Sequence, residues 1–315
     1  MVTILLATYN GAKYITGQLN SLLSQTYAET KILIRDDRST DSTRSIIESY
    51  VERYPDKIVL IESETPSGSA KNNFFLLLSA VREGNYFMFC DQDDCWLPEK
   101  VELTLSLMRE REQKEPDIPV LIHTDLIVAD DKLQEIAPSF IRYQDLHPSR
   151  SSLNYMLTQN NITGCTIMFN RKLLDLALLT VDTRSVIMHD WWLGLLASSL
   201  GEVAYLDTPT ILYRQHDNNQ VGAIDVFSGA YFLKLLRRAF RPGQRSLNPP
   251  LQAGAFERCY GQLLSDSHLE TIRAYSRFPE MGRLSRLKTT IKYKLYMQSR
   301  LRTILSVAYN FIFGK

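Results

Sequence analysis

Residues 86–94 read Tyr-Phe-Met-Phe-Cys-Asp-Gln-Asp-Asp, an apolar run that turns abruptly acidic. The apolar part is short and continuous, which is typical of a strand that helices cover on both faces. Asp91 and Asp93 follow it at a spacing of two. In a tight turn both carboxylates can reach one hard cation, the usual way in which proteins hold Mg²⁺ or Mn²⁺. The passage therefore predicts a buried strand with a metal-binding turn at its carboxyl end.

Apolar runs of this kind alternate with helical patterns through the first 130 residues. The expected strands are Val2–Ala7, Lys31–Arg35, Ile58–Ile61, Tyr86–Cys90 and Val120–His123. The expected helices are Ala12–Ser24, Ser42–Arg53, Ala70–Arg82 and Pro98–Glu112. The alternation indicates β-α-β units and predicts an α/β fold with a mostly parallel, Rossmann-like sheet. Such sheets bind ligands at the carboxyl ends of their strands.

The pattern is less regular after residue 130. The expected elements there are the helices Leu153–Thr158 and Met188–Leu200 and the strands Cys165–Phe169, Val203–Leu206 and Ile211–Tyr213. Helical patterns dominate from about Ala223, and the turn-rich passages Arg241–Arg245 and Asn248–Pro250 predict a linker. We therefore expect a body over residues 1–222, divided near residue 130, and a helical C-terminal region over 223–315.

The composition indicates a globular protein that works inside the cell. The chain has 315 residues, of which 44% are hydrophobic and 23% charged. Four cysteines are too few to staple a chain of this size, which favours a reducing compartment. The N-terminus lacks the basic start of a signal peptide, and the longest apolar runs fall short of the roughly 18 residues of a membrane span. These features predict a cytoplasmic protein with at most peripheral membrane contact.

The net charge of +1 conceals an asymmetry. Residues 231–315 hold 16 Lys and Arg against 4 Asp and Glu, a charge of +12, so the remainder carries −11. The last part, from Arg283 to Lys315, has eight basic and no acidic residues, and its leucines and isoleucines form a helical stripe. We expect a helix in the interface of an anionic membrane. The alternative is that the stripe packs on the body; nucleic-acid binding is not expected.

Two other strand ends are polar, namely Thr8–Gly11 and Asp36–Asp41. Ser39, Thr40 and Asp41 are good helix caps, so we assign capping to Asp41 and ligand binding to Asp36 and Asp37. The glycine-rich phosphate loops of dehydrogenases and P-loop enzymes are absent, and no calcium loop of the EF-hand type follows Asp91. A diphosphate would instead be neutralised by a metal and by side chains such as Lys71, Arg214 or His216.

The polar motifs together resemble those of family 2 glycosyltransferases, which have the GT-A fold. They are Thr8-Tyr9-Asn10-Gly11, Asp36-Asp37 with Ser39-Thr40-Asp41, Asp91-Gln92-Asp93-Asp94 with Trp96, and His189-Asp190-Trp191-Trp192. They come in the expected order and span residues 1–220. The passages around Asp91, Asp190 and His216 are most similar to bacterial rhamnosyltransferases of cell-wall rhamnan and surface-polysaccharide assembly.

The resemblance implies roles for individual residues. Asp190 would be the general base, and Asp91, Asp93 and His216 would hold Mn²⁺ or Mg²⁺, although His216 is equally compatible with a plain loop histidine. The implied donor contacts are Thr8, Tyr9, Asn10, Asp36, Asp37, Lys71, Asn72, Asp91 and Arg214. The implied acceptor contacts are His189, Trp191 and Trp192. One tryptophan is expected in the core, and His189 could instead orient Asp190.

The resemblance has one departure and one informative absence. Arg38 stands where the family usually has a glycine, which would be strained if the backbone there has positive φ; we expect its guanidinium in solvent. The Gln-x-x-Arg-Trp signature of processive synthases is missing. The expected activity is the transfer of L-rhamnose from dTDP-β-L-rhamnose to a lipid-linked saccharide at the inner face of the membrane. A UDP-hexose donor or a catalytically silent nucleotide-sugar-binding subunit is the alternative.

Overall fold

The computed structural model describes residues 1–216 and 248–313, and it has strands where the apolar runs of the first 130 residues predict them. The predicted runs became β1 (Val2–Thr8), β2 (Thr30–Asp36), β3 (Ile58–Ile61), β4 (Tyr86–Cys90) and β6 (Val120–Ala129). The others are β5 (Cys95–Trp96), β7 (Glu135–Ala137), β8 (Ile167–Asn170) and β9 (Glu202–Arg214). All seven residues of β1 are buried, as a central strand requires.

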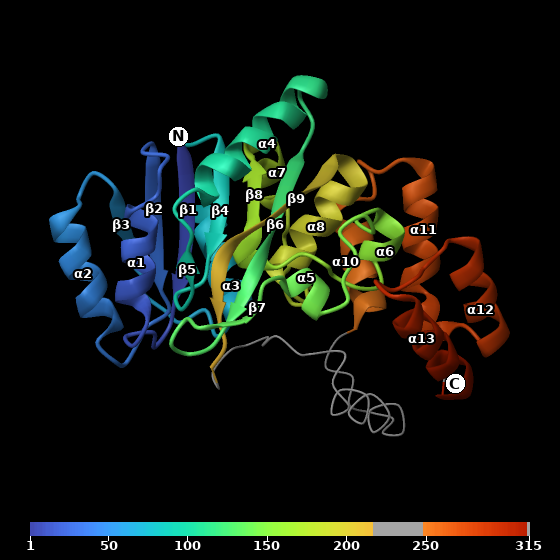
Figure 1. Ribbon diagram of the computed structural model, residues 1–315. Helices are drawn as coiled ribbons and strands as arrows, with labels where there is room; N and C mark the ends of the chain where they lie inside the picture. Colours follow the sequence, from blue (N-terminus) through green and yellow to red (C-terminus); the bar gives the residue numbers. More distant parts are fainter. Residues whose placement is uncertain (217–247, 314–315) are drawn as a thin grey trace.

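The described strands form one sheet in the order β3-β2-β1-β4-β8-β6-β9-β5, with β7 added beside β6 (Figure 1). Strands β1 to β4 are parallel to their neighbours within that group, and β6 is parallel to β9. Strand β8 runs antiparallel between β4 and β6, and β5 antiparallel to β9. The mostly parallel α/β sheet is confirmed. The carboxyl ends of β1, β2 and β4 meet at one edge because their registers pair Thr8 with Asp36 and Leu6 with Cys90.

Helices cover both faces of this sheet. Those of the body are α1 (Ile15–Leu23), α2 (Thr43–Arg53), α3 (Ala70–Ala80), α4 (Lys100–Lys114), α5 (Phe140–Tyr143), α6 (Leu153–Met156), α7 (Arg171–Ala177) and α8 (His189–Leu200), with a 3₁₀ turn η1 (Gly164–Thr166). The C-terminal elements are α10 (Pro249–Tyr260), α11 (Asp266–Ser276), the 3₁₀ turn η2 (Phe278–Glu280), α12 (Arg283–Lys292) and α13 (Arg300–Phe313). Figure 1 shows α11, α12 and α13 at the end of the molecule away from β3 and α2.

Two expected features differ from the structure. The runs Val203–Leu206 and Ile211–Tyr213 belong to one strand, β9, whose register beside β6 shifts near Asp125 and so absorbs the polar residues between them. The passage Asn248–Pro250 is the start of α10 rather than part of a linker. The Asn248 side chain accepts a hydrogen bond from the amide of Leu251, and the prolines occupy the first turn, where their missing N–H is not needed.

The C-terminal helices share a core with the body. Phe256 and Tyr260 of α10 belong to the same buried cluster as Phe74 and Trp192, and the Phe256 ring meets the Trp192 ring edge-on at 5.2 Å. The predicted boundary near residue 222 and the passage Arg241–Arg245 lie outside the described residues. The helices that follow are therefore anchored to the body by α10. No helix within the described ranges is long and apolar enough to cross a bilayer.

Candidate active site

The polar ends of β1 and β2 bind each other. The Thr8 hydroxyl donates to Asp36 at 2.9 Å, and the hydroxyl and amide of Ser39 donate to the same carboxylate. Asp37 pairs with the Arg35 guanidinium at 2.9 Å and accepts from the Ser67 hydroxyl at 2.8 Å. Burial by itself raises the pKa of Asp37, but the hydrogen bonds from Ser67 and Arg35 outweigh it and lower that pKa. Both carboxylates are buried, and a nucleoside would have to share oxygens that already accept hydrogen bonds.

The turn after β2 has the geometry for which the family uses glycine. Arg38 has φ +67°, a left-handed conformation that disfavours a residue with a Cβ. Its guanidinium lies near the surface, 3.3 Å from the carbonyl oxygen of Glu64. The N-cap residue of α2 is Ser42 and not Asp41, but the Asp41 side chain accepts hydrogen bonds from the amides of Ala12 and of Thr43, the first residue of the helix. The strain at Arg38 indicates that the turn is held by its neighbours.

Gln92 joins the turn after β1 to the acidic turn after β4. Its side chain accepts from the Tyr9 amide at 2.8 Å and donates to the Tyr9 carbonyl at 2.9 Å. The Tyr9 ring is exposed, and Asn10 accepts from the amide of Thr40 at 2.8 Å. A Cβ on Gly11 would lie 2.2 Å from the Gln92 amide group, so a larger residue there would displace this amide from Tyr9. Sequence reasoning assigned no role to Gln92.

The acidic turn faces the end of β9. The Asp93 carboxylate lies 2.9 Å from Nε2 of His216, and the Arg214 side chain donates to the Asp93 carbonyl at 2.7 Å. Burial, together with the charges of Asp93 and Asp190, raises the pKa of Asp91 to about 7. Asp94 is fully buried and accepts from the Arg214 amide at 3.1 Å. Asp93 therefore lies against His216, whereas the ligand atoms of Asp91 lie within 4.8 Å of those of Asp94 and Cys165. A common metal site of Asp91, Asp93 and His216 stays a prediction.

Tyr14 holds the cationic side chains of this edge and was missed by sequence reasoning. Its ring stacks on His216 at 4.8 Å, and the Arg214 guanidinium lies over the same ring at 4.8 Å. The Tyr14 hydroxyl donates to Asp131, which also pairs with Lys13. Nothing in the local sequence signals this role, because the partners of Tyr14 come from the turn after β6 and the end of β9.

Asp190, the predicted general base, is the second residue of α8 and lies near the acidic turn. The charges of the two carboxylates affect each other, since Asp190 contributes to the raised pKa of Asp91. Burial raises the pKa of Asp190 to about 6, although hydrogen bonds from the amides of Trp191 and Gly164 and from the Asn160 side chain oppose the shift. Asp190 is therefore mostly ionised at neutral pH and can accept a proton.

His189 lies beneath Asp190 and does not reach the surface. Its ring stacks on Phe74 at 4.0 Å and meets Phe89 edge-on, and burial lowers its pKa to about 3. Neither ring nitrogen has a hydrogen-bond partner among the described residues. A Cβ on Gly164 would lie 2.9 Å from Nε2 of His189, so Gly164 must lack a side chain. The direct acceptor contact expected of His189 is not supported; the ring packs under Asp190 instead.

Both tryptophans after Asp190 are buried, Trp192 fully and Trp191 largely. Trp192 is fully buried against α10, and its indole N–H donates to the Thr180 hydroxyl at 2.9 Å. It is the expected core tryptophan, and its buried ring gives no support to an acceptor contact. Trp191 is also largely buried, with its indole N–H donating to the Met156 carbonyl. A contact of Trp191 with the acceptor stays a prediction.

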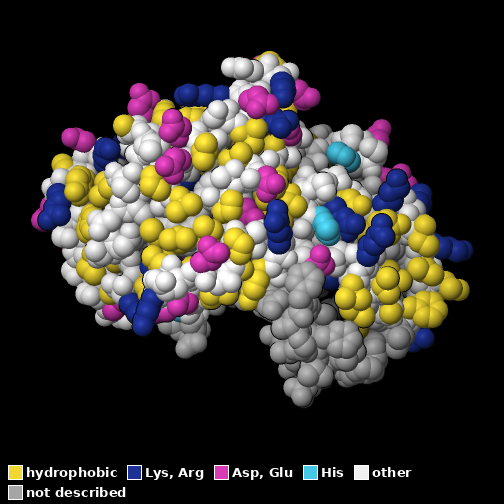
Figure 2. All heavy atoms as spheres, in the orientation of Figure 1, with side chains coloured by type: hydrophobic (Ala, Val, Ile, Leu, Met, Phe, Trp, Pro, Cys, Tyr) yellow, Lys and Arg dark blue, Asp and Glu magenta, His cyan; other side chains and the backbone are white. Residues whose placement is uncertain are grey.

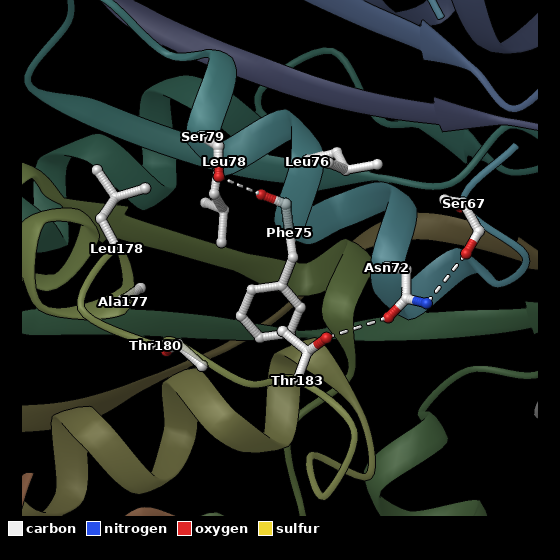
Figure 3. Close-up of a pocket in the computed structure, with 10 residues that line it drawn as sticks. All are labelled: Ser67, Asn72, Phe75, Leu76, Leu78, Ser79, Ala177, Leu178, Thr180 and Thr183. Atoms are coloured by element: carbon white, nitrogen blue, oxygen red, sulfur yellow. Dashed lines mark hydrogen bonds between the residues drawn. The ribbon is translucent and has the colours of Figure 1, made fainter. Parts of the chain in front are cut away.

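Lys71 and Asn72 connect α3 to the segment before α8. The Lys71 ammonium donates to the carbonyls of Thr183 at 2.9 Å and Val186 at 2.7 Å. Asn72 donates to the Ser67 carbonyl and accepts from Thr183 (Figure 3). Asn72 also borders a cavity of about 350 Å³ between α3 and the α7–α8 connection, where Figure 3 shows the Phe75 side chain between Leu178 on one side and Asn72 on the other. Donor binding by Lys71 and Asn72 stays a prediction.

The fold of the chain is similar to that of solved glycosyltransferases. Structures similar to the chain include S. aureus TarS 1-349 in complex with UDP-GlcNAc (TM-score 0.53, 18% identity, covering 98% of this chain and 88% of that one). Another is GalNAc-T7 with UDP, GalNAc and Mn²⁺ (TM-score 0.52, 10% identity, covering 98% of this chain and 57% of that one). The fold is the GT-A fold of glycosyltransferases.

The sequence comparisons narrow the class to one family. The glycosyl transferase family 2 pattern matches residues 3–175, more than half of the chain. The dTDP-rhamnosyl transferase RfbG of Shigella flexneri is 31% identical over 235 residues, which cover 72% of this chain and 76% of that protein. The chain belongs to glycosyl transferase family 2, as the motifs predicted.

Proposed function

We propose that the chain is a metal-dependent inverting glycosyltransferase that moves L-rhamnose from dTDP-β-L-rhamnose to a lipid-linked saccharide in bacterial cell-wall or surface-polysaccharide synthesis. The observation that carries the proposal is the approach of Asp190 to the Asp91–Asp93 turn at the carboxyl edge of the sheet. The similarity to a dTDP-rhamnosyl transferase supports the choice of donor.

Asp190 has the properties of the general base. Its carboxylate is fixed by Gly164, Trp191 and Asn160, and its pKa of about 6 leaves it ionised but still basic at neutral pH. In the proposed reaction it takes the proton of an acceptor hydroxyl as that oxygen attacks the anomeric carbon. One displacement at that carbon inverts its configuration. The fixed position matters because a general base acts only at hydrogen-bond distance.

Asp91, Asp93 and His216 fit a divalent cation. Carboxylate oxygens suit Mg²⁺ and Mn²⁺, and an imidazole is acceptable to Mn²⁺. Burial is the main cause of the raised pKa of Asp91, and the neighbouring charges of Asp93 and Asp190 add to it; a cation would relieve the repulsion between these carboxylates. When bound, Mn²⁺ or Mg²⁺ supplies the charge that stabilises the departing diphosphate. His216 and Arg214, which both pack on the Tyr14 ring, would bind the same diphosphate.

The nucleoside would lie at the ends of β1 and β2. The proposed donor contacts are Thr8, Tyr9, Asn10, Asp36, Asp37, Lys71, Asn72, Asp91 and Arg214. Tyr9 offers an exposed ring on which a base can stack. Hydrogen bonds such as those of Asp37 with Arg35 and Ser67 already order these side chains. Binding of a nucleoside would therefore cost little conformational entropy.

A UDP-hexose is the alternative donor, since similar folds occur in proteins whose structures contain UDP-GlcNAc. A catalytically silent nucleotide-sugar-binding subunit is the second alternative, and the intact set of Asp91, Asp93 and Asp190 favours an enzyme over it. The proposed place of action is the inner face of the cell membrane, where a lipid-linked acceptor would be found, with peripheral contact through the basic C-terminal helices.

The test is a thermal-shift panel of dTDP-rhamnose and UDP-hexoses, each with and without Mn²⁺, because a ligand that binds only the folded chain raises its melting temperature. We expect the largest Mn²⁺-dependent shift with dTDP-rhamnose, and transfer of rhamnose with inversion to a saccharide acceptor. A larger shift in melting temperature with a UDP-sugar would contradict dTDP-rhamnose as the donor and favour the UDP-sugar. Binding without donor hydrolysis or transfer would favour the silent subunit.

A further inference from the structure

Helix α12 is oriented with its polar side inward. Arg286, Thr289 and Thr290 are buried, and Arg286 is only 8% exposed. Leu284 and Ile291 are 68% and 59% exposed. A helix on the surface of a globular protein ordinarily shows the reverse pattern, with its apolar stripe facing the core. Helix α12 therefore exposes two large apolar side chains, Leu284 and Ile291, among the polar residues Arg283, Ser285, Lys288 and Lys292.

Hydrogen bonds explain why this orientation is stable. The Arg286 guanidinium donates to the carbonyls of Phe278 at 2.9 Å and Pro279 at 2.8 Å, both in the 3₁₀ turn η2. The Thr290 hydroxyl donates to the Arg286 carbonyl at 2.9 Å. Turning α12 over would bury Leu284 but would break the bonds of Arg286. The exposure of the leucine and isoleucine side is thus fixed by the fold.

Helix α13 adds a second exposed apolar row. Leu301 and Ile304 are exposed, Ile304 to 64%, and Phe311 follows on the same side at helical spacing. Helices α12 and α13 contact each other. Figure 2 shows hydrophobic side chains gathered over the region of α12 and α13, with Lys and Arg side chains at the margins. We call the set Leu284, Ile291, Leu301, Ile304 and Phe311 the C-terminal apolar face.

The segment that carries this face holds charges of one sign, although Glu270 and Glu280 are exposed on the neighbouring elements. Residues 283–315 contain eight Lys and Arg and no Asp or Glu. Arg283, Lys288, Lys294 and Arg300 are exposed, and Lys292 pairs with Glu270 on the neighbouring helix α11. A second copy of the chain would bring the same positive charge to the contact and be repelled. An anionic lipid surface is attracted by the charges and can also accept the apolar side chains.

We propose that the C-terminal apolar face lies in the interfacial region of a bilayer that contains anionic lipid, with the surrounding Lys and Arg side chains at the level of the headgroups. Leu295 of the stripe packs in the core, as the alternative reading of the sequence expects, but the exposure of Leu284 and Ile291 leaves the rest of the stripe available to a membrane. The inference rests on the proposed function only through the lipid-linked acceptor, which such a contact would bring within reach of Asp190.

The experiment is flotation of the full chain with vesicles of phosphatidylcholine, with and without phosphatidylglycerol, at low and high salt. We expect binding only when phosphatidylglycerol is present, and we expect it to fall as salt rises. The double variant Ile291→Ser with Ile304→Ser should bind such vesicles more weakly by on the order of tenfold or more, because two apolar side chains are lost from the contact. Both side chains are exposed, so the variant should fold.

The matched control is Leu103→Ser with Leu263→Ser, two exposed leucines outside the face, which should bind as the unchanged chain does. Binding that is absent at low salt, independent of phosphatidylglycerol, or equal in both double variants would overturn the proposal. So would a dimer, detected by light scattering, that only the Ile291 and Ile304 substitutions dissociate. Transfer to a water-soluble acceptor should be the same in the unchanged chain and in all variants. If none of these proteins transferred sugar, the proposed function would be contradicted, but the vesicle measurements would still test the membrane contact.

Discussion

The carboxyl edge of the sheet and the C-terminal apolar face depart from the usual distribution of side chains in opposite directions. At the edge, Asp36, Asp94 and Asp190 are buried, although carboxylates ordinarily face water. At the face, Leu284 and Ile291 are exposed, although such side chains ordinarily pack inside. In each place the fold holds the unfavourable arrangement with hydrogen bonds. Arrangements of this kind are typical of sites that await a ligand.

The two regions also differ in charge and in how local substitutions should act. The acids of the edge belong to the part of the sequence that carries −11, and the face to the part that carries +12. The edge should respond to substitution with losses of activity at nearly constant stability. The face should respond with almost no change in either, because its proposed partner is not part of the chain.

The largest effect is expected from Asp93→Ala at the edge. The substitution removes a metal ligand from a turn without loss of core packing, so Mn²⁺-dependent donor binding and measurable transfer should both be lost while the melting temperature is kept. Transfer assays and thermal shifts with dTDP-rhamnose would measure this. The exposed Asp117→Ala is the control. Full activity of the unchanged chain in EDTA would contradict the metal site.

Asp190→Asn should be next in size. The amide keeps the shape of the side chain but cannot accept the acceptor proton, so kcat should fall by about 10²–10⁴-fold. Donor affinity, measured by thermal shift, should change little. An Asn variant that lost donor binding but kept turnover at saturation would make Asp190 a nucleotide contact.

The pH dependence gives a graded test of the same edge. Because the pKa of Asp190 is about 6, kcat should fall as pH drops through 6, where the base becomes protonated. Because the pKa of Asp91 is about 7 in the metal-free protein, Mn²⁺ affinity should weaken as pH drops below 7, where protons compete with the metal. A flat kcat between pH 5 and 7 in a glycosyl-transfer assay, with chemistry rate-limiting, would count against Asp190 as the base.

Gly164→Ala should have a smaller effect. The new Cβ would lie 2.9 Å from Nε2 of His189, whose ring is confined by Phe74 and Phe89, so Asp190 should be displaced. A misplaced catalytic group costs about tenfold to a hundredfold in kcat. Steady-state kinetics would show the loss in kcat rather than in the KM for the donor. The control is Gly17→Ala, where a Cβ meets nothing within 4 Å; an equal loss in both would exclude positioning by Gly164.

The smallest effect is expected at the face. Leu284→Ser removes an exposed leucine and should change the free energy of unfolding by less than about 0.5 kcal/mol. Phe256→Ala, in the core beside Trp192, should cost about 3–5 kcal/mol. Urea unfolding would measure both. A cost at Leu284 comparable to that at Phe256 would show that α12 packs on the body through its apolar side.

The sequence was a good guide wherever the signal was local. The apolar runs located β1 to β4, and the helix signals placed α2, α3 and α4 within a few residues. Ligand-binding residues of parallel sheets follow the carboxyl ends of the strands, so the polar passages after Thr8, Asp36 and Cys90 predicted which residues would lie together at the sheet edge. The motif around Asp190 could be placed only by its resemblance to a family, since a single carboxylate at the start of a helix has no signature of its own.

Contacts between residues that are distant in the sequence could not be predicted from local sequence patterns. Gly164 and Asn160 support Asp190, and Tyr14 orders His216 and Arg214, but none of these pairs is near in sequence. The motif predicted acceptor contacts for Trp192 and His189, whereas the packing of the structure shows that both side chains are buried. A motif specifies residue types and order, whereas exposure depends on what the rest of the chain places on top.

Helix α12 shows the same division most clearly. The sequence by itself determined that residues 283–292 form a helix with an apolar side and a basic surround, because periodicity and composition are properties of neighbouring residues. Only the tertiary structure decided which side faces outward, because the hydrogen bonds from Arg286 to the carbonyls of Phe278 and Pro279 draw the polar side in. Periodicity is the same for a helix turned either way, so the choice had to come from contacts between elements.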